Sequence, residues 1–155
     1  MRAAIVCGPR TGTGFDAVAD ALDQASIDDD VPAFDYVVVG GATGTDYQAW
    51  RWAVSREMIA VTVPAQWTSS GRGRGAGPER NRKMLELAQP VVVLAFLSDG
   101  PGTKHMTDHA SAMGTPVFWW GPDDGIWVLD ERCKKPRRDD GESTSECRAI
   151  TVRPT

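Results

Sequence analysis

Three glycine-rich segments of the chain each follow an apolar run of the kind that forms a β-strand. They are residues 8–14, 40–46 and 100–103. Glycine lets a backbone approach a ligand closely, and N–H groups at the start of a helix attract phosphate. Residues 40–46 also fit a tight turn in which Thr43 or Thr45 caps a helix and Asp46 lies in its first turn. The pattern therefore predicts either a phosphate-binding turn or a structural one.

Basic residues gather in one stretch of an otherwise acidic chain. Between residues 65 and 84, five basic residues stand against the single acidic Glu79, whereas the whole chain has a net charge of −4. The five are Arg72, Arg74, Arg80, Arg82 and Lys83. A basic patch beside glycine turns suits a phosphate-bearing ligand. The alternative is an exposed basic loop whose charges are solvated.

These segments lie between elements that alternate along the chain. Apolar runs typical of strands lie at 3–6, 36–39, 59–63, 91–97 and 117–120, and helical patterns lie at 14–25, 45–56, 79–88 and 103–113. Such alternation predicts an α/β fold with three layers, a Rossmann-like parallel sheet of about five strands with helices on both faces. Since ligands of such folds bind beyond the carboxyl ends of the strands, the glycine turns are expected to gather there.

Length and composition describe a globular chain. Its 155 residues are 41% hydrophobic and 25% charged, which excludes extensive disorder and collagen. We expect one domain at 1–120 and a C-terminal extension at 121–155, which either forms an edge hairpin from 126–129 and 148–152 or is partly disordered. The longest apolar runs are too short for a membrane span or a signal peptide, so a cytoplasmic location is expected. Three cysteines without a CxxC motif favour thiols.

Two further motifs have simple structural interpretations. His105 and His109 have the i, i+4 spacing of a zinc helix, but Met106 stands where the HExxH motif has its glutamate and no third ligand is adjacent. No metal is therefore expected. Cys7 follows a strand and lacks an evident base partner, which favours a buried structural thiol.

Several motifs in sequence order resemble the DUF2493 family, a branch of the SLOG superfamily that is common in bacteria and their phages. They are Gly40–Asp46, Trp52-Ala53, Pro64-Ala65-Gln66-Trp67, Ala76-Gly77-Pro78 with Arg80-Asn81 and Met84, and Gly100, Gly102, Thr103 and Met106. The resemblance covers residues 3 to about 118. It implies a Rossmann-like fold that binds a nucleotide or a nucleotide-derived ligand at the strand ends.

Together, the resemblance and the glycine turns assign a set of ligand-binding candidates. They are Gly8, Pro9, Arg10, Gly40, Gly41, Thr43, Gly44, Asp46, Trp67, Arg80, Asn81, Gly100, Gly102 and Thr103. Backbone N–H groups and Arg80 would hold phosphates, and Asp46 would accept a hydrogen bond from a ribose hydroxyl. Trp67 would stack on a base. No obligatory cofactor is expected beyond this ligand.

The LOG phosphoribohydrolases of the same superfamily allow a comparison of catalytic residues. Arg80 and Met84 match their R-x-x-x-M segment, and Gly100, Gly102 and Thr103 match part of their PGGxGTxxE segment. Met106 stands where that segment has its glutamate, and a thioether can neither move a proton nor stabilise an oxocarbenium-like centre. The catalytic residues are therefore unknown, with Asp46, Arg80 and Asp99 as candidates.

Three functions remain open from the sequence. The first is binding of ADP-ribose, an NAD derivative or a nucleoside phosphate, as a sensor or a sequestering protein. The second is hydrolysis of a nucleotide at an N-glycosidic or phosphate bond. The third is binding of single-stranded DNA in the manner of DprA, against which the net charge weighs. A homodimer through the tryptophan-rich helix that holds Trp50 and Trp52 is expected, and no membrane partner.

Overall fold

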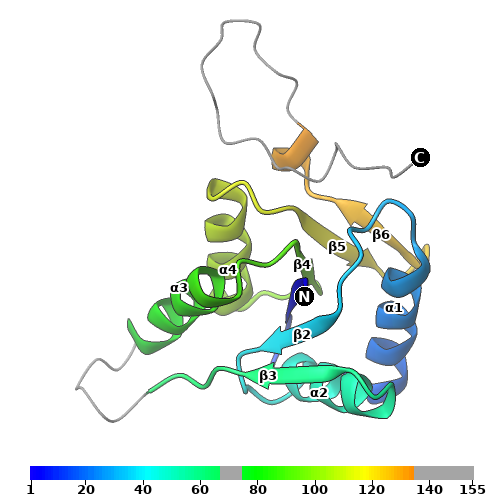
Figure 1. Cartoon of the computed structure of the whole chain (residues 1–155), viewed down its shortest axis with the longest axis horizontal. Coiled ribbons are helices and arrows are strands. Elements are labelled where there is room, and N and C mark those ends of the chain that lie inside the picture. Colours follow the sequence, from blue (N-terminus) through cyan, green and yellow to red (C-terminus); the bar gives the residue numbers. More distant parts are fainter. Residues whose placement is uncertain (67–74, 135–155) are drawn as a thin grey trace, which may run out of the picture.

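The computed structural model describes residues 1–66 and 75–134 of the chain. In order, the strands are β1 (Ala3–Cys7), β2 (Tyr36–Val39), β3 (Ile59–Thr62), β4 (Val92–Ala95), β5 (Val117–Gly121) and β6 (Ile126–Leu129). The helices are α1 (Phe15–Ile27), α2 (Thr45–Ser55), α3 (Ala76–Ala88) and α4 (Pro101–Ala112), and a short 3-10 helix covers Glu131–Lys134. Each of the first four strands is followed by a helix (Figure 1).

The six strands form one sheet in the order β3-β2-β1-β4-β5-β6. The first five strands are parallel, and β6 pairs antiparallel with β5 through register partners such as Trp120 and Trp127. The predicted α/β fold with a parallel sheet is confirmed. The strand order reverses between β1 and β4, because the chain leaves β1 toward β3 and returns beside β1 as β4. A ligand crevice is expected beyond the carboxyl ends of the two strands at such a switch point.

Helices cover both faces of the sheet (Figure 1). On one face, α1 and α2 bury Val18, Leu22 and Trp52 against side chains such as Val6 and Val37. On the other face, α3 and α4 pack against strand residues of the opposite parity. These strand residues include Ile5, Val38 and Val93, and Met84 of α3 and Met106 of α4 pack in the same cluster. The alternation arises because successive strand residues point to opposite faces.

Element boundaries differ from the predicted ones at a few places. Helix α3 begins at Ala76, three residues before the predicted start, and includes Pro78 in its first turn. A proline is tolerated there because the first N–H groups of a helix have no partner within the helix. Helix α1 continues past Ala25 to Ile27, which is 75% exposed and so lies off the apolar stripe.

The C-terminal part contributes one described strand. The predicted strand at 126–129 is confirmed as β6, whereas the predicted strand at 148–152 lies outside the described residues. Trp127 of β6 is buried and donates from Nε1 to the Ala21 carbonyl of α1 at 2.7 Å. The division into a domain at 1–120 and an extension stays a prediction. Within the described residues, no helix has the length and apolar character needed to cross a membrane.

Candidate functional site

The turns after β1 and β2 meet the start of α4 at the carboxyl edge of the sheet. They enclose a narrow cavity of about 40 Å³. Its lining combines polar groups with a few apolar side chains from the strand ends. The lining residues are Val6, Cys7, Gly8, Arg10, Gly40, Ala42, Asp46, Arg80, Asn81, Met84, Gly102, Thr103 and Met106. Eight of these were predicted as ligand-binding residues from the sequence.

The turn after β1 lies directly over the start of α2. Thr45 donates to the Pro9 carbonyl twice, from its backbone N–H at 3.0 Å and from Oγ1 at 3.1 Å. Thr43 Oγ1 donates to the Arg10 carbonyl at 3.0 Å. Gly44 has φ +74°, and a Cβ there would lie within 2.5 Å of the Pro9 and Arg10 backbones. Glycine is therefore required where the two turns cross.

This arrangement corrects the predicted roles of Thr43 and Thr45. Neither caps α2, since the N-cap is Gly44 and makes no side-chain cap hydrogen bond. The two hydroxyls instead hold the turn after β1, and the first N–H group of α2 is already bonded to Pro9. The turn after β1 thus covers the start of α2. This leaves less space for a phosphate at the α2 N-terminus than the glycine-rich turn at 40–46 predicts.

Asp46 is the buried carboxylate of the site. Only 7% of the residue is exposed, and its Oδ2 accepts the Ala42 N–H at 3.1 Å. Burial raises the pKa of this carboxyl, while the Ala42 N–H and the positive charge of Arg80 act in the opposite direction. The net result is a pKa above the ordinary value of an aspartate.

Arg80 connects α3 to the end of β2. Its Nη1 donates to the Gly40 carbonyl, and its Nε donates to Asn81 Oδ1 at 3.0 Å. Burial lowers the pKa of the guanidinium, and the Asp46 carboxylate raises it. A methyl group at Gly40 would overlap this guanidinium. Gly40 is therefore needed for close approach, although its backbone conformation is ordinary.

Asn81 joins α3 to the first turn of α4. Its Nδ2 donates to the Gly102 carbonyl at 3.2 Å and lies 3.3 Å from His105 Nδ1. Asn81 is buried, so these contacts hold the relative position of the two helices. The amide thus places the start of α4 next to Arg80.

The first turn of α4 lines the cavity. Gly100 is its N-cap and makes no side-chain cap hydrogen bond among the described residues, and proline occupies the first helical position. Gly102 and the buried Thr103 line the cavity. An uncapped first turn leaves donors and a positive dipole end that favour an anion. Between the starts of α2 and α4, that of α4 is the better placed for a phosphate.

Other predicted residues lie outside the cavity. Gly41 is exposed with φ +75° beside Thr62 and Pro64, and Asp99 is exposed in the turn before α4. Pro9, Thr43, Gly44 and Gly100 shape the turns but do not line the cavity. Trp67 lies outside the described residues, as do Arg72 and Arg74 of the basic patch.

Several lining residues were not predicted. Cys7, Ala42, Met84 and Met106 line the cavity, and Met84 and Met106 are part of the core beneath it. The place of Cys7 as the last residue of a strand was the available signal. Burial raises the pKa of the Cys7 thiol, and the Asp46 charge raises it further. The thiol therefore stays protonated near neutral pH and is not an activated nucleophile.

The two histidines of α4 lie side by side at the margin of the site. Their rings are stacked with centroids 5.7 Å apart. Burial, followed by the charges of His109 and Arg82, lowers the pKa of His105. Within the described residues, no group of three or more His, Cys, Asp or Glu side chains is arranged to hold a metal ion.

Comparison with known proteins gives one clear relative. The Gene 61 protein of Mycobacterium phage D29 is 32% identical to this chain over 130 residues, which cover 78% of this chain and 98% of that protein. The chain belongs to the Gene 61 family. No family model matches the sequence.

Among solved structures, the crystal structure of UDP-GlcNAc 2-epimerase from Neisseria meningitidis bound to UDP-GlcNAc is similar with a TM-score of 0.47 and 15% sequence identity. The similarity covers 77% of this chain and 32% of the epimerase chain, so this Gene 61 family member spans about a third of that protein. The expected homodimer and the cytoplasmic location stay predictions.

Proposed function

We propose that the cavity at the carboxyl edge of the sheet binds a nucleotide or a nucleotide-derived ligand such as ADP-ribose, an NAD derivative or a nucleoside phosphate. The observation that carries the proposal is the convergence of the Arg80 guanidinium and the uncapped start of α4 on one cavity. A cationic side chain and backbone N–H groups that point to one place are suited to a phosphate.

The cavity is lined by a positive group, Arg80, and by a carboxylate, Asp46, and these two groups suggest an orientation for the ligand. A phosphate would lie between Arg80 and the N–H groups of Gly102 and Thr103. The Asp46 carboxylate, which is buried beside Arg80, would accept a hydrogen bond from a ribose hydroxyl. Arg80 would exchange its bond with the Gly40 carbonyl for a charge-assisted bond with the phosphate.

The cavity is small, so binding of a nucleotide needs a movement of the side chains that line it, Arg80 among them. The volume of about 40 Å³ is close to that of one water molecule, which occupies about 30 Å³ in the liquid. A rotation of the guanidinium away from Gly40 would widen the cavity toward the solvent. Arg80 is half-buried, so part of its side chain already faces the solvent.

A sensing or sequestering role fits the side chains better than hydrolysis. Met106 is part of the core and replaces the glutamate of the LOG enzymes, and the Cys7 thiol is protonated. One observation favours the second function, a LOG-like hydrolase. The raised pKa of Asp46 beside Arg80 would let this carboxyl act as a general acid or base.

A thermal-shift screen tests the binding proposal. The ligands are AMP, ADP-ribose, NAD, a cyclic dinucleotide and a short single-stranded DNA, each with the full-length protein. A ligand that binds only the folded state stabilises it by about 2.7 kcal/mol at a hundredfold excess over Kd. We expect a shift with one mononucleotide-like compound. A shift with DNA alone, lost at high salt, would replace the proposal by DNA binding.

Product analysis separates binding from hydrolysis. The compound that shifts the midpoint is incubated with wild type and with Asp46→Asn, and products are separated by chromatography. Under the sequestering proposal, the compound is recovered intact from both proteins. Release of a free base or of inorganic phosphate by wild type, but not by Asp46→Asn, would make the hydrolase the better description.

We propose further that the Gene 61 family is a branch of the SLOG superfamily and that the protein is a homodimer through α2. The glycine turns after β1 and β2 and the Arg80–Asn81 pair on α3 support the first statement. For the second, α2 exposes Tyr47, Trp50 and Val54 on its outer face, where Tyr47 and Trp50 stack at 6.3 Å. Exposed aromatic side chains of this kind are enriched at protein interfaces.

A further inference from the structure

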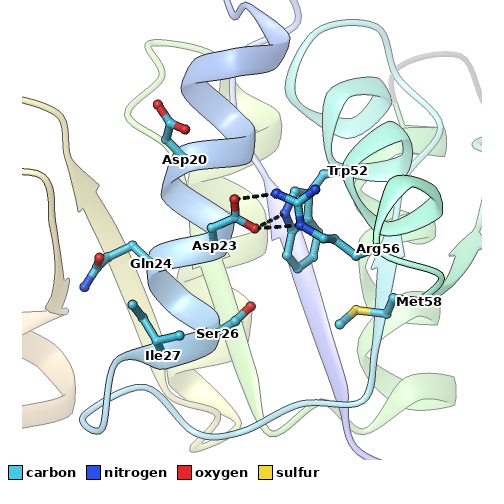
Figure 2. Close-up of a pocket in the computed structure, with 8 residues that line it drawn as sticks. All are labelled: Asp20, Asp23, Gln24, Ser26, Ile27, Trp52, Arg56 and Met58. Carbon is cyan, nitrogen blue, oxygen red and sulfur yellow. Dashed lines mark hydrogen bonds and ion pairs between the residues drawn. The ribbon is translucent and has the colours of Figure 1, made fainter.

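A second and larger cavity, an open groove, lies at the opposite edge of the sheet from the glycine turns. It has a volume of about 580 Å³, inside the range of about 300–1,000 Å³ typical of ligand sites. It lies between the carboxyl ends of α1 and α2, which run back toward the edge where the parallel strands begin. Its lining residues are Asp20, Asp23, Gln24, Ser26, Ile27, Trp52, Arg56 and Met58 (Figure 2).

One wall of this groove is held by an internal ion pair. Asp23 accepts hydrogen bonds from Arg56 Nη2 at 2.6 Å, from Arg56 Nε at 3.0 Å and from Trp52 Nε1 at 2.8 Å (Figure 2). These bonds lower the pKa of Asp23, which stays charged and matches the Arg56 charge. The positive charge in the groove is therefore already neutralised.

The remaining charges around the groove are negative. Asp20 is exposed one turn before Asp23 and has no ion-pair partner among residues 1–66 and 75–134. Neither α1 nor α2 carries a basic residue in its last turn, and three aspartates at 28–30 follow α1 directly. The carboxyl end of a helix bears a partial negative charge, so two such ends add to the field of the carboxylates.

Apolar side chains line the same groove. Ile27 is 75% exposed on its rim, and Met58 is half-buried. The indole of Trp52 is buried beneath the ion pair. Lysine and arginine side chains combine an aliphatic stem with a cationic head, so they match a groove that offers apolar surface beside the carboxylate of Asp20.

We propose that this groove binds a basic segment of a partner protein. A lysine or arginine side chain of the segment would lay its stem against Ile27 and Met58 and place its cationic head beside Asp20. The aspartates at 28–30 would attract neighbouring basic residues of the same segment. This proposal is independent of the nucleotide proposal, because the two cavities lie at opposite edges of the sheet and share no residue.

Fluorescence anisotropy with a labelled heptalysine peptide tests the proposal on the full-length protein. Wild type is compared with Asp20→Asn, Ile27→Ser and Asp16→Asn. The last is the matched control, because Asp16 is exposed on the same helix, carries the same charge and lies outside the groove. All three positions are exposed on α1, and circular dichroism is to check that each variant is folded.

We expect saturable binding that Asp20→Asn and Ile27→Ser each weaken about threefold, the size typical of one exposed charge or contact. Asp16→Asn should leave Kd within about twofold. Equal weakening by Asp16→Asn and Asp20→Asn would show that only the general negative field attracts the peptide, and the groove proposal would be wrong. Spermidine that displaces the peptide at equal concentration would also overturn it, since the groove would then bind a free amine.

Discussion

The guanidinium of Arg80 donates a hydrogen bond to the carbonyl of Gly40, 40 residues away in the sequence. The bond joins α3 to the end of β2 and brings a positive charge near Asp46, which is buried on the same cavity. One side chain therefore connects two elements at the cavity and is also the group to which the proposal assigns the phosphate. This relationship is the basis of the first prediction.

Replacement of Gly40 by alanine is expected to displace Arg80, because a methyl group there would overlap the guanidinium. Because the overlapping atoms are the end of a flexible side chain, Arg80 can move aside, and the cost is its lost hydrogen bond to the Gly40 carbonyl. We expect this loss to lower the free energy of unfolding by about 1.5–3 kcal/mol. Urea denaturation measures this loss. The control is Gly14→Ala, since a Cβ at Gly14 meets nothing within 4 Å and the change at this N-cap costs less than about 1 kcal/mol. Equal losses in both variants would show that the approach of Arg80 to Gly40 is unimportant.

Asp46 is expected to make the protein less stable as the pH rises. Its folded pKa is raised by burial, so the folded state binds its proton more tightly than the unfolded state does. The favourable contribution is therefore complete below the ordinary carboxyl pKa of 3.8 and is lost as the pH rises through the folded value. The measurement is the free energy of unfolding of wild type minus that of Asp46→Asn between pH 4 and 7. The difference should fall with pH, and a rising difference would contradict the account.

Asp130 should show the opposite dependence on pH. Burial raises its pKa, but hydrogen bonds from Arg132 and from Trp119 Nε1, the latter at 2.8 Å, outweigh burial and hold the pKa at about 2. Its stabilising contribution is thus present above the ordinary pKa of 3.8 and is lost as the pH falls toward about 2. Asp130→Asn should cost about 1–3 kcal/mol at pH 7 and less at pH 2. Denaturation curves at the two pH values test this, and an equal cost at both would refute the assignment.

The proposed homodimer makes a prediction for α2. Trp50 is 40% exposed beside Tyr47 and Val54, so Trp50→Arg would place a charge in the apolar interface. We expect wild type to elute at twice the monomer mass in size-exclusion chromatography with light scattering, and the variant at the monomer mass. Leu87→Arg is the control, because Leu87 is 70% exposed on α3. A monomeric wild type, or dissociation by both variants, would remove the proposed interface.

The sequence alone predicted those elements whose bounds depend on neighbouring residues in the chain. The strand at 36–39 is confirmed with its predicted bounds, since β-branched residues continue until Gly40 ends the run. The convergence of Gly8, Gly40 and Gly102 was predictable as well, because parallel strands place their following turns at one edge.

Contacts between distant segments were beyond prediction. The roles of Thr43 and Thr45 depend on the backbone of Pro9 and Arg10, more than 30 residues away, so a local capping pattern could not reveal them. Met106 is in the core because α4 packs its inner face on β4 and β5, which only the tertiary arrangement decides. The groove between α1 and α2 was not predicted for a similar reason, since its ion pair joins Asp23 of α1 to Arg56 at the end of α2.

Calorimetric titration of the best ligand from the nucleotide panel into wild type, Arg80→Gln and Arg82→Gln tests the central claim most directly. Arg82 is exposed on the same helix as Arg80 and does not line the cavity, so the two variants lose the same charge. The account predicts that wild type binds, that Arg80→Gln binds at least about tenfold more weakly, as expected for a lost bond to a charged group, and that Arg82→Gln binds within about twofold of wild type. No nucleotide binding by wild type, or equal weakening in both variants, would contradict it.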